Sequence, residues 1–433
     1  MAFLSPFRKY FEGSKKSLFQ KARWVVEGIL ISPLKNLQVI ATSLGKSDYQ
    51  ALQHFISNSV WNWTAIEDEV AKQFYKLVQK LGSLNNLCLI IDESGIAKKG
   101  KASAGVAHQY CGSTGKNDNC QVGVFAALCC GPLVSIIKSK LYLPTCWTSN
   151  SIRMDKAGVP HQHRTYRSKL EMTWEMILDV KKRLKIPFKW VVFDAFYGRD
   201  LDLLGKLHRQ AIPFVAQIPC SHYVFLKDFS LEVPRPKNTR GRKPTKAKPT
   251  TKSIRVENYI QMLKTKDWKK ITVRHSSRGE LKAHFHRVRV WLLDGESLAK
   301  YQFTLLIRKD LNGDISFHLT NSKAHLQRLA YMQGQRYFVE RAFQDAKQQL
   351  GLDQYQVRSY SAWHKHMAMV MMAQLFTQLE KVTINPKRLV VSTQDIVKVI
   401  TCLIVNPVAL EKLVKQILVK NKTLFAKIRY LTK

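Results

Sequence analysis

Acidic residues are scarce in this sequence. It contains 31 Asp and Glu against 70 Lys and Arg, which gives a formal net charge of +39 over 433 residues. Such an excess indicates a polyanionic partner, because a protein that contacts phosphates releases the counterions condensed on them. We therefore expect nucleic acid to be the main partner.

Three other patterns are missing. None of the eight cysteines forms a C-x-x-C pair, so neither a zinc ribbon nor a disulfide framework is indicated. The longest apolar runs, such as MAMVMMAQLF at 367–376, fall short of the roughly 20 residues that span a bilayer. The first residues lack the uninterrupted apolar stretch of a secretion signal. We expect a cytoplasmic protein with no membrane partner.

Residues 1–82 have the pattern of helices. Ser32 followed by Pro33 predicts one helix start, and capping boxes opened by Ser47 and Thr64 predict two more. This part is basic and contains three tryptophans. We predict a helical DNA-binding domain, and the alternative is that these helices only pack against the body of the protein.

The pattern then changes to short runs rich in Val, Ile, Leu and Cys, bounded by Gly, Asn and Pro, which predict strands. The expected order is three strands (84–94, 119–131, 133–144), a helix (168–184), a strand ending at Asp194, a helix (200–210) and a strand (212–219). This is the order of a ribonuclease H-like core that lacks only its final helix.

A basic segment opens the insertion that follows this core. Residues 235–255 carry nine Lys or Arg among Pro and Gly and no acidic residue, a composition that stays unfolded alone. We expect Arg240, Arg242 and Lys243 to contact DNA phosphates, which adds affinity with little sequence preference. The alternating pattern after this segment predicts β-structure.

The fold class predicted is α/β. We expect a ribonuclease H-like mixed sheet with a β-rich insertion before the last catalytic helix, flanked by helical N- and C-terminal parts. The predicted boundaries are the helical N-terminal domain (1–82), the first part of the core (83–217), the insertion (218–322), the closing core helices (323–385) and a helical tail (386–433).

The stretch 335–367 predicts the final helix of the core. At about 100° per residue, Arg336, Glu340 and Lys347 lie along one polar stripe, and apolar residues occupy the other side. The helix thus presents one carboxylate between two cations. The alternative is a solvated surface with ordinary ion pairs, each of about 0.2–0.5 kcal/mol.

Two Asp residues end predicted strands, Asp92 the first and Asp194 the fourth. In a ribonuclease H-like sheet these strands are neighbours, so the two side chains can meet with Glu340 opposite. Three such carboxylates would bind two Mg²⁺ ions, with Mn²⁺ as a substitute. The alternative for each Asp by itself is a turn or cap residue. Glu93 and Asp345 face away from these positions and are not predicted ligands.

The spacing Arg-x3-Glu-x6-Lys in this helix, followed by LGLDQYQVRSY, resembles the closing signature of the transposases encoded by bacterial insertion sequences. The segments 92–124 and VFDAFYG at 192–198 extend the resemblance to DDE transposases with a β insertion before the catalytic Glu. The resemblance implies a ribonuclease H-like fold with Asp92, Asp194 and Glu340 as the metal-binding catalytic triad. One position departs from the signature, since Gln333 stands where it has Tyr.

The resemblance also implies an activity: cleavage of the DNA ends of an insertion sequence and their transfer to target DNA. The expected partners are double-stranded DNA with terminal inverted repeats, target DNA and a second copy of the chain, in the bacterial nucleoid. Side chains expected to contact DNA phosphates are Lys98, Lys99, Lys101, Arg336 and Lys347. The alternatives are a catalytically silent DNA-binding descendant of such an enzyme and a general nuclease without strand transfer.

Other motifs have competing interpretations. The segment 95–102 fits Gly-x4-Gly-Lys, but Ala102 stands where a P-loop needs a hydroxyl for Mg²⁺, so a P-loop nucleotide hydrolase is disfavoured. Trp291 is either a buried aromatic or a wedge that stacks on an extruded base. His161 and His163 have no Cys or His partners that would complete a metal site and stay unassigned.

Overall fold

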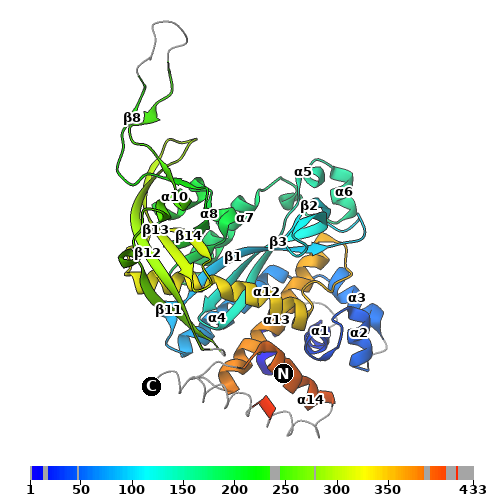
Figure 1. Ribbon diagram of the computed structural model, residues 1–433. Helices are drawn as coiled ribbons and strands as arrows, with labels where there is room; N and C mark the ends of the chain where they lie inside the picture. The colour runs from blue at the N-terminus through cyan, green and yellow to red at the C-terminus, as the bar shows by residue number, and fades with distance from the viewer. Residues whose placement is uncertain are drawn as a thin grey trace. The chain divides into compact units, whose positions relative to one another are not determined.

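The structure is a computed structural model that describes residues 2–12, 18–45, 48–234, 244–276, 279–384, 391–405 and 416–417. The chain divides into two compact units (Figure 1). Unit 1 contains Met1–Lys189, Ser277–Gly279 and Gln335–Lys433, and unit 2 contains Trp190–Ser276 and Glu280–Gly334. None of the helices in the described ranges is long and apolar enough to cross a membrane.

An antiparallel sheet forms the centre of unit 1. Its strands are β1 (Cys88–Ala97), β2 (Ala107–Cys111), β3 (Lys116–Cys130) and β4 (Leu133–Leu141). β3 pairs with β1 along one edge and with β2 and β4 along the other. The three predicted strands are present as β1, β3 and β4, and they are almost entirely buried because their runs are apolar on both faces.

Helices from both ends of the chain cover this sheet. The main ones are α4 (Trp63–Lys80), α12 (Arg336–Leu350) and α13 (Tyr360–Ile384). α13 packs against β4, α4 and α1 (Phe19–Ile31). It is buried nearly all round, as expected for a helix in the middle of a unit, and several of its buried side chains are polar.

The free edge of β4 is closed by side chains. The backbone N–H groups of Ile136 and Ser139 donate to Gln374 Oε1 (2.9 Å) and Glu67 Oε1 (3.2 Å). A third N–H, of Val134, donates to Gln378 (3.4 Å). An exposed strand edge can pair with a strand of another chain. These side chains occupy the N–H groups of β4 and so prevent such pairing.

The remaining described helices of unit 1 are short. They are η1 (Ala2–Tyr10), α2 (Leu37–Ser43), α3 (Tyr49–Ser57), η2 (Leu84–Asn86), α5 (Thr145–Thr148), α6 (Ser151–Lys156), η3 (His161–His163), α7 (Lys169–Leu178), η4 (Asp179–Arg183) and α14 (Thr393–Val405). The helical pattern expected at 168–184 is confirmed as α7 and η4, and Ser168 and Glu171 form a capping box at its start.

Two predicted helix starts were wrong. Ser32 follows the last residue of α1, because the residue before a proline disfavours helical geometry. The next helix is instead capped by Asn36. Thr64 lies inside α4, whose cap is Asn62. Ser47 lies outside the described residues.

Unit 2 contains a mixed sheet. Its strands are β5 (Val191–Phe193), β6 (Phe214–Ile218), β11 (Lys269–Ser276), β12 (Gly279–Leu293), β13 (Lys300–Asp310) and β14 (Ile315–Thr320). Their order is β11-β12-β13-β14-β6-β5, in which β5 and β6 run parallel. The helices are α8 (Ala195–Gly198), α9 (Leu201–Arg209), α10 (Val256–Ile260) and α11 (Leu326–Gly334).

Part of the segment expected to be unfolded has defined structure. Lys248–Pro249 pairs with Leu231–Glu232, and Ile254–Arg255 pairs with Tyr223–Val224. The prediction was wrong for these residues, because backbone pairing stabilises a stretch whose side chains alone cannot build a core. Residues 235–243 lie outside the described residues, and with them Arg240, Arg242 and Lys243.

The fold class is therefore confirmed as α/β. The antiparallel strands that open a ribonuclease H-like core are in unit 1. The parallel pair β5 and β6, joined through α8 and α9, is in unit 2 together with the β-rich insertion. The helix that closes the predicted core, α12, is in unit 1.

Candidate active site

Asp92 lies inside β1. We expected it to end the strand, but pairing with β3 continues from Asp92 to Ala97, because the polar residues that follow still exchange backbone hydrogen bonds. The side chain is half-buried, and its Oδ1 accepts from the backbone N–H of Glu93 (2.8 Å). Asp92 stands opposite Phe125 of β3, so these two side chains share one face of the sheet.

Glu340 lies on α12, which packs against that same face. Phe343, one helical turn after Glu340, contacts the ring of Phe125 edge-on with centroids 5.3 Å apart. Because Phe125 is the cross-strand neighbour of Asp92, this contact brings the Glu340 turn of α12 to the Asp92 side of the sheet. In unit 1 the helix that carries Glu340 therefore packs on the face of the sheet to which Asp92 belongs.

The polar stripe predicted on α12 is present. Glu340 is 51% exposed and forms an ion pair with Arg336 (2.8 Å), and Lys347 is half-buried on the same side. The opposite side carries Val339, Ala342 and Ala346, which are fully buried. The Arg336–Glu340 pair is the contact expected of an ordinary surface helix, and it leaves a role of either cation in DNA binding as a prediction.

Asp194 belongs to unit 2 and directly follows β5. Its Oδ1 accepts from the backbone N–H groups of Phe196 (3.0 Å) and Tyr197 (3.3 Å), so it caps α8. A Cβ on Gly198 would lie 1.9 Å from the carbonyl oxygen of Gln217, so only glycine lets α8 approach β6 this closely. The conformation of VFDAFYG thus fixes the carboxylate at the end of β5.

Carboxylate oxygens are the ligand type that Mg²⁺ and Mn²⁺ prefer, and the side chains of Asp92 and Glu340 are each partly exposed. Asp92 and Glu340 belong to unit 1 and Asp194 to unit 2, and the predicted triad stays a prediction. Within the described ranges, no three His, Cys, Asp or Glu side chains form a cluster that could hold a metal ion.

The neighbouring carboxylates have structural partners. Glu93, on the other face of β1, pairs with Lys169 of α7 (2.6 Å). Asp345 is buried, accepts from Thr393 Oγ1 (2.7 Å) and pairs with Arg341 (3.0 Å). These contacts hold α7 and α14 in place and agree with leaving both acids out of the site.

A large hollow lies beyond the end of β1 in unit 1, and we call it the basic groove. It has a volume of about 960 Å³ and is lined by α2, α3 and the segments 98–103 and 355–359. Its cationic lining residues are Lys35, Lys98, Lys99 and Arg358, and no Asp or Glu is among the described residues that line it. Such a surface favours an anionic ligand.

Lys98 is part of the floor of the basic groove. Its ammonium lies 3.6 Å from the ring centroid of Tyr355 and donates to the Tyr355 carbonyl (3.3 Å). Burial lowers the pKa of Lys98 to about 8. Lys99 and Lys101 are exposed. A P-loop is contradicted, because the described chain passes from β1 through a turn into β2 without the helix that would bind phosphate.

Sequence reasoning missed the other half of this groove. Lys35 is buried, donates to the carbonyl of Ser32 and has its pKa lowered to about 8 by burial. Arg358 belongs to the LGLDQYQVRSY stretch, so the motif contained a signal, whereas Lys35 stands in no pattern that marked it.

A comparison with protein families now adds to this geometry. The family described as "DDE superfamily endonuclease" matches residues 21–280. The chain belongs to this family. The match includes Asp92 and Asp194 and ends before Glu340. The expected resemblance to DDE enzymes is confirmed.

Two individual proteins are also similar. The "Probable transposase for insertion sequence element IS701" of Microchaete diplosiphon is 30% identical to this chain over 198 residues, which is 44% of this chain and 46% of the relative. The chain thus spans about half the length of this curated relative. The NurA nuclease from Sulfolobus solfataricus is 10% identical, covers 64% of this chain and 88% of its own, and has a TM-score of 0.27, which is too low to support a structural argument.

The remaining candidates from the sequence have ordinary contacts. Gln333 is buried in unit 2, where it accepts from Arg308 (3.1 Å), so it replaces the signature Tyr with a structural hydrogen bond. Trp291 is half-buried under the ammonium of Lys300, 4.8 Å from its ring centroid. His161 is exposed.

Proposed function

We propose that this DDE endonuclease is a transposase that cleaves the DNA ends of an insertion sequence and joins them to target DNA. The observation that supports the proposal is the contact of Phe125, the cross-strand neighbour of Asp92, with Phe343 of the helix that carries Glu340. Family membership, the net charge of +39 and the transposase name of the relative support it.

Asp92, Asp194 and Glu340 would hold two divalent cations, Mg²⁺ or Mn²⁺. When bound, such ions activate the attacking water or 3′-hydroxyl and neutralise the leaving oxygen. The protein would supply the ligands from three elements and hold one of them, Asp194, by the backbone of α8. Arg336 would leave its ion pair with Glu340 and contact a phosphate, because the divalent ions would then neutralise the Glu340 carboxylate.

The basic groove would hold the DNA strand away from the cut. Six residues separate Asp92 from Lys98 along β1, which corresponds to about 20 Å at about 3.3 Å per residue. Successive phosphates of one strand rise by about 3.4 Å along the axis of a duplex, so a duplex that runs along β1 would meet the groove roughly six nucleotides from the scissile bond. Lys99 and Arg358, which line the groove, would contact the duplex, and Lys101 is an exposed cation in the same segment.

The proposal includes double-stranded DNA with terminal inverted repeats and a homodimer on it, because an element has two ends and each copy would cut one. The test uses a plasmid that carries the gene with its natural flanking DNA, a second plasmid as target, and the purified full chain with Mg²⁺.

Cuts at the element ends together with joined products in the target plasmid are the expected result. Cuts without joined products would identify a nuclease. End binding with neither cuts nor joined products would identify a catalytically silent DNA-binding protein. Absence of binding would contradict the proposal altogether.

A further inference from the structure

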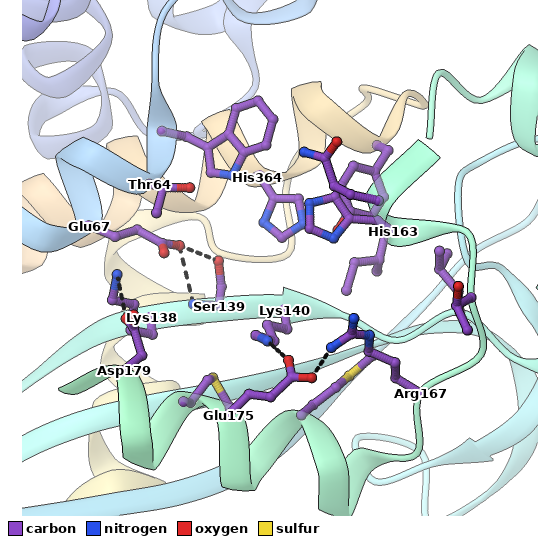
Figure 2. Close-up of a pocket in the computed structure, with 18 of the residues that line it drawn as sticks. Thr64, Glu67, Lys138, Ser139, Lys140, His163, Arg167, Glu175, Asp179 and His364 are labelled. Atoms are coloured by element: carbon purple, nitrogen blue, oxygen red, sulfur yellow. Dashed lines mark hydrogen bonds and ion pairs between the residues drawn. The ribbon is translucent and has the colours of Figure 1, made fainter. Parts of the chain in front are cut away.

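A second cavity in unit 1 lies outside the predicted active site and the basic groove. It encloses about 530 Å³ at the free edge of β4, where α4, α7 and α13 meet. Figure 2 shows His364 and His163 on one side of it, with Lys140, Glu175 and Arg167 across from them.

His364 is the unusual residue of this cavity. Its side chain is buried, with 4% of the residue exposed, and neither ring nitrogen has a hydrogen-bond partner among the described residues. Burial lowers the pKa of His364 to about 3, so the ring is neutral and offers one donor and one acceptor. Buried polar atoms without partners are costly and rare in folded proteins, and the residue that carries these two is part of the lining of a cavity large enough for a ligand.

The charged groups of the same cavity are already matched. Glu175 accepts from both Lys140 and Arg167, and Glu67 accepts from Ser139 Oγ (2.6 Å). Lys138 pairs with Asp68 and Asp179 at the far end. Because each of these cations forms an ion pair with a carboxylate, the described lining of the cavity has no unpaired positive charge to bind an anion. The groups that lack a hydrogen bond belong to the neutral ring of His364.

The walls around His364 are flat and apolar. Trp63 stacks on its ring with centroids 5.5 Å apart and planes 15° apart, and Tyr360 lies at 4.6 Å. His163 stacks on Tyr360 at 5.4 Å. Met172 and Met176 complete the apolar lining. Aromatic and thioether side chains of this kind make favourable contacts with a planar ring.

We propose that this cavity binds a nucleobase, with a ring nitrogen of His364 as a hydrogen-bond partner for the edge of the base. A base is planar and uncharged and carries hydrogen-bond donors and acceptors along its edge, so it could supply the hydrogen-bond partner that the His364 ring lacks. It could come from a free nucleoside or from an unpaired base in a DNA strand. The proposal goes beyond the proposed function, because a strand can be cut without any base entering this cavity.

The test measures binding to the full chain by calorimetry in two arms without divalent metal. One arm uses adenosine, guanosine, cytidine and thymidine. The other compares a duplex with one unpaired base to the same duplex with an abasic position. The variant His364→Phe keeps a stacked ring and removes both nitrogens, and His222→Phe, which removes a partly buried imidazole in unit 2, is the control.

We expect saturable binding in at least one arm, weakened about three- to tenfold by His364→Phe, the net effect of one or two hydrogen bonds, and unchanged by His222→Phe. Binding of a free nucleoside identifies the first source, and preference for the unpaired base alone identifies the second. Absence of saturable binding in both arms, or equal binding by both variants, overturns the proposal.

A second measurement applies to the unmutated protein and decides the case where His364→Phe does not fold. ¹⁵N-histidine spectra should show both His364 ring nitrogens shifting at ligand saturation. Resonances that stay in place while ligand binds elsewhere would overturn the proposal. Neither arm contains a metal ion or a cleavable end, so loss of transposase activity and loss of base binding are separate results.

Discussion

Gln374 of α13 ties the edge of the unit 1 sheet to the helix that carries Glu340. Its Oε1 accepts from the backbone N–H of Ile136 in β4 (2.9 Å), and its Nε2 donates to the carbonyl of Ala342 in α12 (3.2 Å). The side chain is 1% exposed. We predict that Gln374→Leu, which keeps the volume and removes both hydrogen bonds, destabilises the protein.

The expected loss of stability follows from the two backbone groups that lose their hydrogen-bond partner. The Ile136 N–H loses its partner in a buried place, which costs about 1–3 kcal/mol. The Ala342 carbonyl also belongs to the hydrogen-bond ladder of α12, so its loss adds less. The expected decrease in the free energy of unfolding is therefore about 1–3 kcal/mol, or about 2–4 °C in melting temperature for each kcal/mol.

Urea denaturation of the full chain followed by circular dichroism measures this change. Gln79→Leu, at an exposed position on α4, is the control and should stay within about 0.5 kcal/mol of the unmutated protein. Gln378→Leu should fall between the two, because its bond to the Val134 N–H is longer (3.4 Å). A Gln374→Leu variant as stable as the Gln79→Leu control would refute the role of this link.

Three further predictions concern charge. Burial raises the pKa of Glu67 from 4.5 to about 7, so the folded state binds the proton more tightly than the unfolded state. The stability of the protein relative to Glu67→Gln should therefore fall as the pH rises from 4.5 to about 7. A difference in melting temperature between the two proteins that does not depend on pH would contradict this. Arg336→Ala and Lys347→Ala should each reduce the salt slope of DNA-end binding by roughly one phosphate contact with little change in melting temperature, whereas a lower melting temperature with unchanged binding would assign both to packing. Deletion of 235–255 should weaken binding to specific and random DNA alike, and unchanged affinity and salt dependence would make the segment a linker.

Elements with a strong local pattern were predictable from the sequence. The apolar runs of β1, β3 and β4 and the stripe of α12 were found because burial on a sheet or one helix face requires such periods. The helix that carries Glu340 packs against Phe125, the cross-strand neighbour of Asp92, because both elements have such patterns, and the shared site of the two carboxylates stays a prediction.

Features that depend on tertiary contacts were not predictable. Asn62 and Thr64 are both residues that can cap a helix, and only the backbone geometry of the first turn decides that Asn62 accepts from the Ala65 N–H. Lys35 lines the basic groove together with the segment 355–359. These stretches are far apart in the sequence, and contacts such as the hydrogen bond from the Lys35 N–H to Gln354 Oε1 hold them together. The cavity at His364 likewise joins elements from three distant stretches of the chain.

The central claim is that Asp92, Asp194 and Glu340 form one metal-dependent site. The direct measurement is Mg²⁺-dependent cleavage of element-end DNA by Asp92→Asn, Asp194→Asn and Glu340→Gln, with Asp345→Asn as the matched carboxylate control. The account predicts that the three variants bind DNA ends but do not cut them, because an amide keeps the shape and loses the charge that holds a divalent ion. It predicts that Asp345→Asn still cuts. Cleavage by any of the three at more than about a tenth of the unmutated rate would remove that residue from the site and contradict the claim.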